Sequence, residues 1–300
     1  MKNEIFLPEA KILVPVVGGD LATFRYGPAG GKPVLLIHGI TSSNRAWQFF
    51  AQALIARGMT AYAVDLRGRG DSGNLPGPFG QRVHVADLLS VMDALGFAKM
   101  DLIGHSSGPF VGLALQGLHP ERVNRQVLID GGIQFPLPPG VTLEQVLAIV
   151  LGPAFARLAM KFESQQAYRD YWRVQPAFAR GWSSALDEYA DYDLRGEAPN
   201  FHSSVNPKAV EEDTAENFVT FDLNRNTLKN LTDEIVMLRA ERGLQNEETA
   251  LYPMSILEAA LIDFPKVKLH TVPDTNHYDI VMSPYGAESC VQYIYGQANQ

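Results

Sequence analysis

Strand-like segments alternate with helix-like segments along the first 130 residues of the chain. Residues 33–37 are a short, continuously apolar run, which is typical of a strand covered on both faces, and residues 100–104 are also expected as a strand. Residues 47–57 and 108–118 have helical periodicity, and Gly58 follows the first of them as a helix stop. This alternation predicts an α/β fold with a mostly parallel, doubly wound sheet.

The strand pattern is interrupted once, between residues 135 and 222. That stretch is rich in helix formers and aromatic residues and begins with a proline-rich run, so we expect a helical cap there, inserted before the last two strands. The core domain would then comprise residues 1–134 and 223–300. Its remaining elements are expected as strands at 21–26, 60–65, 123–130, 234–240 and 267–272, and as helices at 84–95 and 284–295.

The composition narrows the class of protein. Cys290 is the only cysteine, which excludes an internal disulfide and a cysteine-based metal cluster. A formal net charge of −8 without a basic stripe argues against nucleic-acid binding. The N-terminal residues carry no secretory signal pattern and no apolar run is long enough to span a membrane, so we expect a cytoplasmic protein, monomeric or homodimeric, that acts on a small molecule without a cofactor or metal.

The sequence Gly104-His105-Ser106-Ser107-Gly108 joins a predicted strand to a predicted helix. A serine at such a turn is strained, and glycines two positions away on each side let the neighbouring backbone pass close to it. The hydroxyl would project from the end of the sheet, at the N-terminus of a helix. Ser106 is therefore the predicted nucleophile.

A serine hydroxyl needs a nearby base, and the chain has seven histidines. His277 follows the predicted strand 267–272 in a polar loop, at the edge of the sheet where α/β proteins build their sites. His38 follows an early strand and is expected to shape its loop. The turn at residues 65–73 lacks the spacing of a phosphate-binding loop, so we expect Arg67 or Arg69 to pair with acids beneath the site.

Together, the Gly104–Gly108 turn, the His38-Gly39 pair, the 65–73 turn and the Asn276-His277 loop resemble the α/β-hydrolase fold superfamily, in its branch of esterases and C–C hydrolases with a helical cap. The resemblance implies an oxyanion hole made by the backbone N–H groups of Ile40 and Ser107. Relatives with halide or epoxide chemistry carry aspartate where this chain has Ser106, which argues against those reactions.

Two positions are candidates for the acid that would complete a triad with Ser106 and His277. Many relatives place it after the strand that follows the cap, but the matching position here is Gly243, with Glu241 as the nearest acid. Other relatives take it from the end of the strand before the cap, where this chain has Asp130 followed by two glycines. We expect Asp130 to be the acid, with Glu241 as the alternative and Glu247 or Glu248 as more distant ones.

The expected activity is hydrolysis of a small, largely apolar ester or lactone through an acyl-enzyme. We expect His38, Gly39, Trp172, Trp182 and Tyr278 to line the substrate pocket. The same triad would serve a C–C bond hydrolase of a vinylogous diketone, for which Arg173 or Arg180 would hold a substrate carboxylate, and also a cofactor-independent perhydrolase. An alternative of another class is a ligand receptor with little turnover.

Overall fold

A computed structural model describes residues 5–134, 140, 142, 145, 151–219 and 222–297. Its centre is an eight-stranded sheet in the order β1-β2-β4-β3-β5-β6-β9-β10, in which only the pairs β1–β2 and β2–β4 are antiparallel. The doubly wound, mostly parallel sheet is therefore confirmed. The strands are β1 (Ala10–Val16), β2 (Gly19–Tyr26), β3 (Lys32–Ile37), β4 (Met59–Val64), β5 (Met100–His105), β6 (Val123–Ile129), β9 (Ile235–Ala240) and β10 (Val267–Val272).

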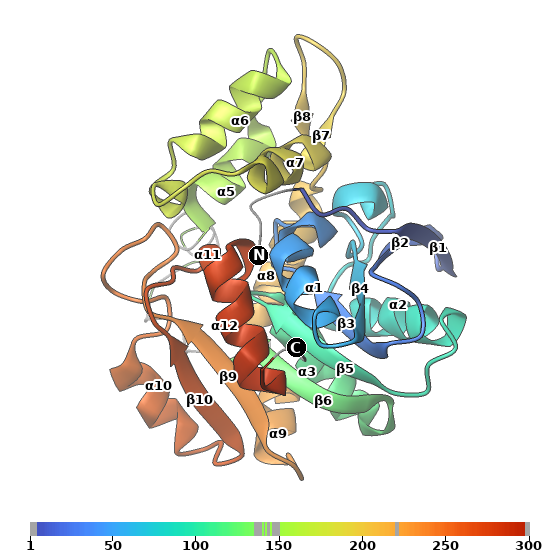
Figure 1. Cartoon of the computed structure of the whole chain (residues 1–300), viewed down its shortest axis with the longest axis vertical. Coiled ribbons are helices and arrows are strands. Elements are labelled where there is room, and N and C mark those ends of the chain that lie inside the picture. The colour runs from blue at the N-terminus through green and yellow to red at the C-terminus, as the bar shows by residue number, and fades with distance from the viewer. Residues whose placement is uncertain are drawn as a thin grey trace.

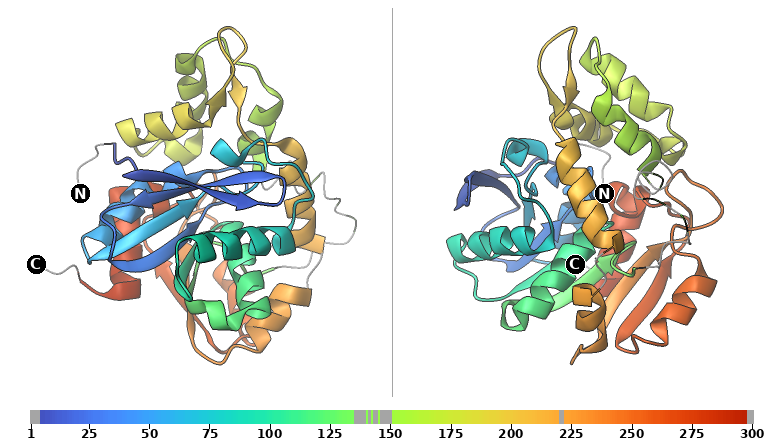
Figure 2. Two further views of the ribbon diagram at one scale, coloured as in Figure 1. Left: turned by 90° about the vertical axis from the view of Figure 1, so that its right-hand side faces the viewer. Right: turned by 180° about the vertical axis from the view of Figure 1, so that it is seen from behind.

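Helices cover both faces of this sheet (Figures 1 and 2). Helices α1 (Gln48–Ile55) and α12 (Pro284–Tyr295) pack together on one face. Helix α3 (Gly108–Leu118) packs between α2 (Gln81–Ala94) and α9 (Asp222–Lys229) on the other. The short α11 (Asp279–Met282) leads into α12, and α10 (Met254–Leu261) lies between β9 and β10 in the chain. The strands β4 and β5 are buried along their whole length, as expected of strands covered by helices on both faces.

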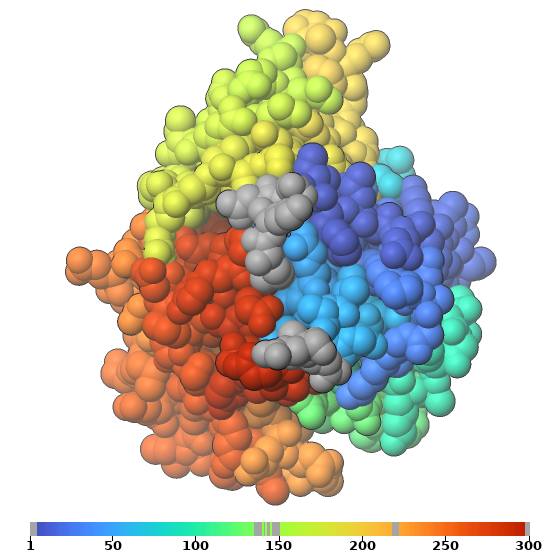
Figure 3. Space-filling view, in the orientation of Figure 1, coloured from blue at the N-terminus to red at the C-terminus, as the bar shows by residue number. Residues whose placement is uncertain are grey.

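Most of the described residues between β6 and α9 form a lobe at one end of the molecule (Figure 1). We call the described residues 151–219 the inserted segment. Its elements are α5 (Gly152–Ala156), α6 (Gln165–Arg173), α7 (Ser184–Asp193), β7 (Leu194–Arg195), β8 (His202–Ser203) and α8 (Pro207–Val219). Figure 3 shows the lobe packed on the C-terminal part of the chain, drawn in red.

The inserted segment lies over the carboxyl ends of the central strands. The Tyr192 hydroxyl donates to Asp65 Oδ2, just after β4, over 2.6 Å, and Arg157 reaches the carbonyl of Thr41 in the loop after β3. Trp172 holds the lobe together, because Tyr168, Phe178 and Tyr189 all pack edge-on against its ring. The proline-rich run 135–139, expected to begin the cap, lies outside the described residues.

Three strands have no counterpart in the sequence prediction. Strand β1 is an edge strand in which only Val14 is buried, so its sequence carries little apolar pattern. Strands β7 and β8 have two residues each, too few for an alternation to appear. Among the described residues, no helix is long and apolar enough to cross a membrane.

Candidate active site

Ser106 stands on a strained turn between β5 and α3. Its φ of 59° lies in the left-handed region, which non-glycine residues rarely adopt. The flanking glycines are required by close backbone: a Cβ on Gly104 would lie 2.4 Å from the nitrogen of Pro109, and one on Gly108 would lie 2.0 Å from the carbonyl oxygen of Ile37. The turn thus presents a serine at the carboxyl end of the sheet, beside the N-terminus of α3.

The structure brings His277 and Asp130 together, 147 residues apart in the chain. His277 Nδ1 lies 2.7 Å from Asp130 Oδ2, and both side chains are buried. The other oxygen, Oδ1, accepts the backbone N–H of Ala240 over 3.0 Å. A carboxylate can only accept here, so Nδ1 carries the ring proton and Nε2 is left as the base.

Glu241, the alternative acid, lies elsewhere. Its side chain is exposed, and Oε2 accepts the backbone N–H of Asp274 over 2.7 Å. Of these two predicted acids, the one in contact with His277 is therefore Asp130.

A close backbone contact explains why a glycine follows Asp130. A Cβ at position 131 would lie 1.9 Å from the carbonyl oxygen of Ser106, so the turn after β6 can approach the serine turn only without a side chain. Asp130 has a φ of 44° and donates its own N–H to the carbonyl of Leu238 over 2.7 Å. Two strained residues on neighbouring turns are thus held by backbone contacts.

Three consecutive carbonyl groups after β3 are each held by a buried side chain. His38 Nδ1 contacts the carbonyl of Gly39 at 2.7 Å, Arg69 Nε donates to that of Ile40 over 2.9 Å, and Arg157 Nη2 donates to that of Thr41 over 2.8 Å. The ring of His38 accepts the N–H of Leu66 at Nε2, so its proton is on Nδ1. Burial lowers the pKa of His38 to about 3, which keeps the ring neutral.

These contacts orient the predicted oxyanion donor at Ile40. The carbonyl of Gly39 and the N–H of Ile40 belong to one planar peptide and point in opposite directions. Holding the carbonyl against His38 therefore fixes the direction of the N–H. The expected pairing of the 65–73 arginines with acids is also present, since Arg67 pairs with Asp87 at 2.8 Å and Arg69 with Asp213 at 2.6 Å.

Cavities flank Ser106 on two sides. A small one of about 30 Å³ is lined by Ser106, His277, Gly39 and Tyr278. A larger one of about 200 Å³, which we call the oxyanion-side cavity, shares Ser106 and Ile40 with it and also contacts Ser107.

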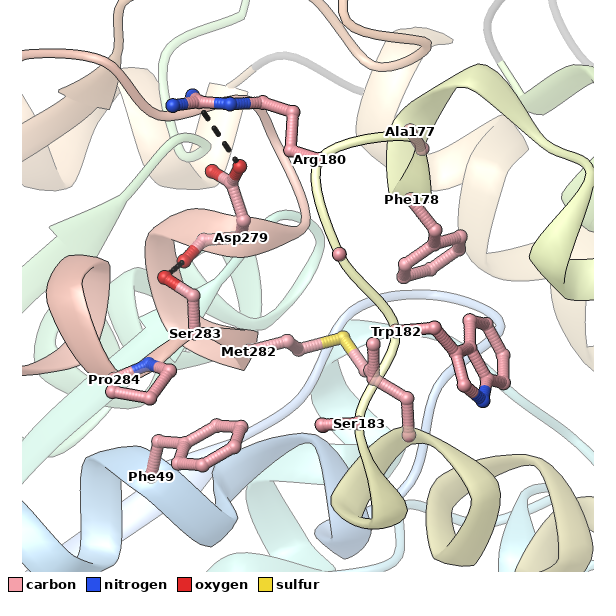
Figure 4. A pocket seen from close by; sticks show the side chains of 12 residues that line it. Phe49, Ala177, Phe178, Arg180, Trp182, Ser183, Asp279, Met282, Ser283 and Pro284 are labelled. Carbon is pink, nitrogen blue, oxygen red and sulfur yellow. Dashed lines mark hydrogen bonds and ion pairs between the residues drawn. The ribbon is translucent and has the colours of Figure 1, made fainter. Parts of the chain in front are cut away.

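A third cavity, of about 190 Å³, lies between the inserted segment and the 279–284 region (Figure 4). Trp182 and Arg180 line it, and Met282 lines both this cavity and the small one at Ser106. Asp279 lies on its wall, where burial raises the pKa of the carboxyl to about 6.

Two of the predicted pocket residues lie elsewhere. His38 is fully buried behind the loop that it supports, and Trp172 packs inside the inserted segment with the Arg157 guanidinium over its ring. The prediction that these two side chains line the pocket is wrong, because both are used to hold other groups. Gly39, Trp182 and Tyr278 do line cavities at or next to Ser106.

Several residues near the site were not predicted, among them four with polar contacts or positions on the inserted segment. Arg157 and, on α8, Asp213, Thr214 and Asn217 belong to the inserted segment but reach the loops around Ser106 or line the oxyanion-side cavity. Each of these four residues lies in an ordinary polar or helical stretch of the sequence, and no sequence motif marks it as part of a site. Among the described residues, no group of three or more histidine, cysteine or acidic side chains could hold a metal ion.

A family model described as "Alpha/beta hydrolase family" matches residues 34–287. A 2-hydroxymuconate semialdehyde hydrolase from Pseudomonas sp. (strain CF600) is 30% identical over 196 residues, 63% of this chain and 62% of that protein. Lipase LipV from Mycobacterium tuberculosis (strain ATCC 25618 / H37Rv) is 34% identical over 174 residues, 58% of each chain. The matches thus span about six tenths of these two relatives.

Among solved structures, the thioesterase domain from the curacin biosynthetic pathway superposes with a TM-score of 0.75 over 94% of this chain and 98% of that one, at 17% identity. At that identity the likeness concerns the fold.

Proposed function

Since this chain belongs to the alpha/beta hydrolase family, we propose that it is a serine hydrolase that cleaves a small, largely apolar carboxylic ester or lactone. The observation that carries the proposal is the contact of 2.7 Å between His277 and Asp130, in a cavity that His277 shares with the strained Ser106. A nucleophile, a base and an acid that orients the base are the parts that acyl transfer requires.

In the proposed reaction, Ser106 Oγ attacks the ester carbonyl carbon while His277 Nε2 takes the hydroxyl proton. The oxyanion that forms accepts hydrogen bonds from the N–H groups of Ile40 and Ser107. The C–O bond to the alcohol breaks, the alcohol leaves with the proton from His277, and Ser106 keeps the acyl group. Water then gives a proton to His277 and attacks the acyl carbonyl carbon. The bond to Ser106 Oγ breaks, the acid is released, and His277 returns the proton to Ser106 Oγ.

Asp130 would hold the proton of His277 on Nδ1 and stabilise the imidazolium that forms during both steps. The inserted segment would act as a cap, since Tyr189 and Leu151 from it line the small cavity at Ser106. The apolar side chains around the cavities favour an uncharged substrate.

Hydrolysis of p-nitrophenyl butyrate tests the proposal. We expect turnover by the native chain, a loss of at least ~1,000-fold in Ser106→Ala, and no change in Ser90→Ala, which removes a hydroxyl from the outer side of α2. Native-level turnover in Ser106→Ala, or no turnover on a panel of esters and lactones, would refute it.

Hydrolysis of a C–C bond is the second candidate, because the Pseudomonas relative is a semialdehyde hydrolase. The two arginines considered for a substrate carboxylate are already paired, Arg173 with Asp187 at 2.7 Å and Arg180 with Asp274 at 2.5 Å. Those pairs favour the ester or lactone.

A further inference from the structure

His105, the residue before the serine of the turn, contacts His277 in two ways. Its Nε2 lies 2.8 Å from the main-chain carbonyl oxygen of His277. The two imidazole rings also lie against each other, with their centroids 4.6 Å apart and their planes tilted by 37°. Both side chains are buried, and both line the small cavity at Ser106. His105 thus contacts both the backbone and the ring of the proposed base.

The proton of His105 is on Nε2. A carbonyl oxygen can only accept, so the nitrogen that faces it must donate. Burial lowers the pKa of His105 well below its usual range, and the neighbouring His277 lowers it further, so the ring carries no second proton. Trp47 packs edge-on against the ring, with the centroids 6.4 Å apart. His105 is therefore a neutral donor with a fixed tautomer.

The carbonyl of His277 depends on this donor. Backbone N–H groups of α11 donate to the carbonyls of Asn276 and Tyr278, which flank His277 in the chain. In the part of the chain that the structure describes, the hydrogen bond from His105 is the only one to the carbonyl of His277. The N–H of His277 is held weakly, since it lies 3.4 Å from the carbonyl oxygen of Gly243. The backbone of His277 is therefore held chiefly by His105.

His105 is itself anchored in the sheet beside the nucleophile. It is the last residue of β5 and pairs with Ile129 of β6. The following N–H, that of Ser106, donates to the carbonyl of Ile129 over 2.9 Å. A group that His105 holds is thus held relative to Ser106. Asp130 fixes the direction of the His277 ring through Nδ1, and the contact with His105 fixes where its main chain lies.

We propose that His105 is a positioning residue, whose Nε2–H holds the main chain of His277 and so keeps the base at the hydroxyl of Ser106. Its neutral ring also lies against the imidazolium that forms in each step of the reaction and adds no competing charge. The inference rests on the proposed function only in taking His277 as the base for Ser106.

Two amide substitutions at position 105 test the inference. The amide nitrogen of glutamine is as many bonds from Cα as Nε2 of histidine, whereas that of asparagine is only as many as Nδ1. His105→Gln can therefore donate to the His277 carbonyl, and His105→Asn is too short. We expect kcat on p-nitrophenyl butyrate to fall ~30- to 100-fold in His105→Asn and to stay within about fivefold of native in His105→Gln, because a misplacement of about 1 Å costs about 100-fold. KM should change less than about threefold in both, since the donor holds the base and not the substrate. Equal kcat values in the two variants would overturn the inference.

Thr60→Val is the matched control. Thr60 is fully buried at the amino end of β4, the opposite end of the sheet from Ser106, and its hydroxyl donates to the carbonyl of Pro28 over 2.7 Å. The variant loses the same kind of bond, and we expect its kcat to stay within about twofold of native. Each activity is measured well below the midpoint of that variant's thermal melt. If Thr60→Val loses as much activity as His105→Asn, the loss reflects general destabilisation and the inference is wrong.

The position of His277 can also be followed without turnover. A proton in a short hydrogen bond to a carboxylate gives a separate low-field nuclear magnetic resonance signal, here from Nδ1–H against Asp130, and its loss in His277→Gln assigns it. We expect this signal in the native chain and in His105→Gln, and expect it to be shifted or lost in His105→Asn. If it follows this pattern while no ester is cleaved, the positioning role stands and the ester hydrolysis does not. If esters are cleaved and the two amide variants behave alike, the reverse holds.

Discussion

Replacing Asp130 by asparagine should remove the base at His277 without removing any side-chain volume. The buried N–H of Ala240 can only donate, so the oxygen of the new amide must take the place of Oδ1 to accept it. The amide nitrogen then faces His277 Nδ1, where it also donates. The ring must therefore accept at Nδ1 and carry its proton on Nε2, which leaves no base for the Ser106 hydroxyl.

The expected loss can be worked from the contact itself. The carboxylate and the imidazolium approach to 2.7 Å, and at an effective dielectric constant of about 20 a charge pair at roughly 3–4 Å gains about 4–6 kcal/mol. At about 1.4 kcal/mol for each factor of ten, this corresponds to a kcat lower by about 10³- to 10⁴-fold. Amide substitution in Ser-His-Asp triads lowers kcat by about 10⁴.

The assay is release of p-nitrophenolate from p-nitrophenyl butyrate at saturating substrate. Glu241→Gln is the matched control, because it makes the same change of carboxylate to amide at an exposed position, where the side chain accepts the N–H of Asp274. We expect its kcat to stay within about twofold of native. The reasoning is refuted if Asp130→Asn keeps more than about a tenth of the activity, or if Glu241→Gln loses more than about tenfold. Near-ultraviolet circular dichroism verifies that both variants are folded.

Two further perturbations follow from the geometry around the site. Gly131→Ala would put a Cβ 1.9 Å from the carbonyl oxygen of Ser106, so we expect the serine turn to shift and kcat on the same ester to fall at least ~100-fold; native kcat would contradict this. Asp279→Asn keeps an acceptor for the N–H of Asn276 but removes a charge. Burial raises the pKa of Asp279 from 3.8 to about 6, so the folded state binds this proton more tightly than the unfolded state does. The free energy of unfolding therefore falls as the pH rises through this range. The variant should therefore melt several degrees higher than the native chain at about pH 8 and at nearly the same temperature at about pH 4; an equal shift at both pH values would show that the charge is not the cause.

The central strands and the serine turn were predictable because their signals are local. The buried parallel strand β3 contains a continuous apolar run at residues 33–37, and the glycines at 104 and 108 mark the close backbone approach that the structure shows. His277 was predictable because it stands in a polar loop at the end of β10. Asp130 depended on the resemblance to a family, since an acid after a strand does not by itself reveal a histidine 147 residues away.

The supporting residues of the inserted segment could not be predicted, because their contacts join that segment to the core. Arg157 reaches the Thr41 carbonyl across 116 residues, and Asn217 reaches Ser107 across 110. Local patterning predicts which face of a helix is buried but not which loop it meets. His38 and Trp172 illustrate the same limit, since their types suit a pocket while their neighbours use them to hold a carbonyl group and an aromatic cluster.

The hydrogen bond from Arg157 to the Thr41 carbonyl has a consequence for protein engineering. Exchanging the lobe of such a hydrolase for that of a relative is an obvious way to change its substrate range. In this chain the exchange would also delete one of the three donors that hold the carbonyls of residues 39–41. A successful chimera must therefore bring a guanidinium to the same point above the sheet, so the lobe and the loop beneath it are exchanged as one unit.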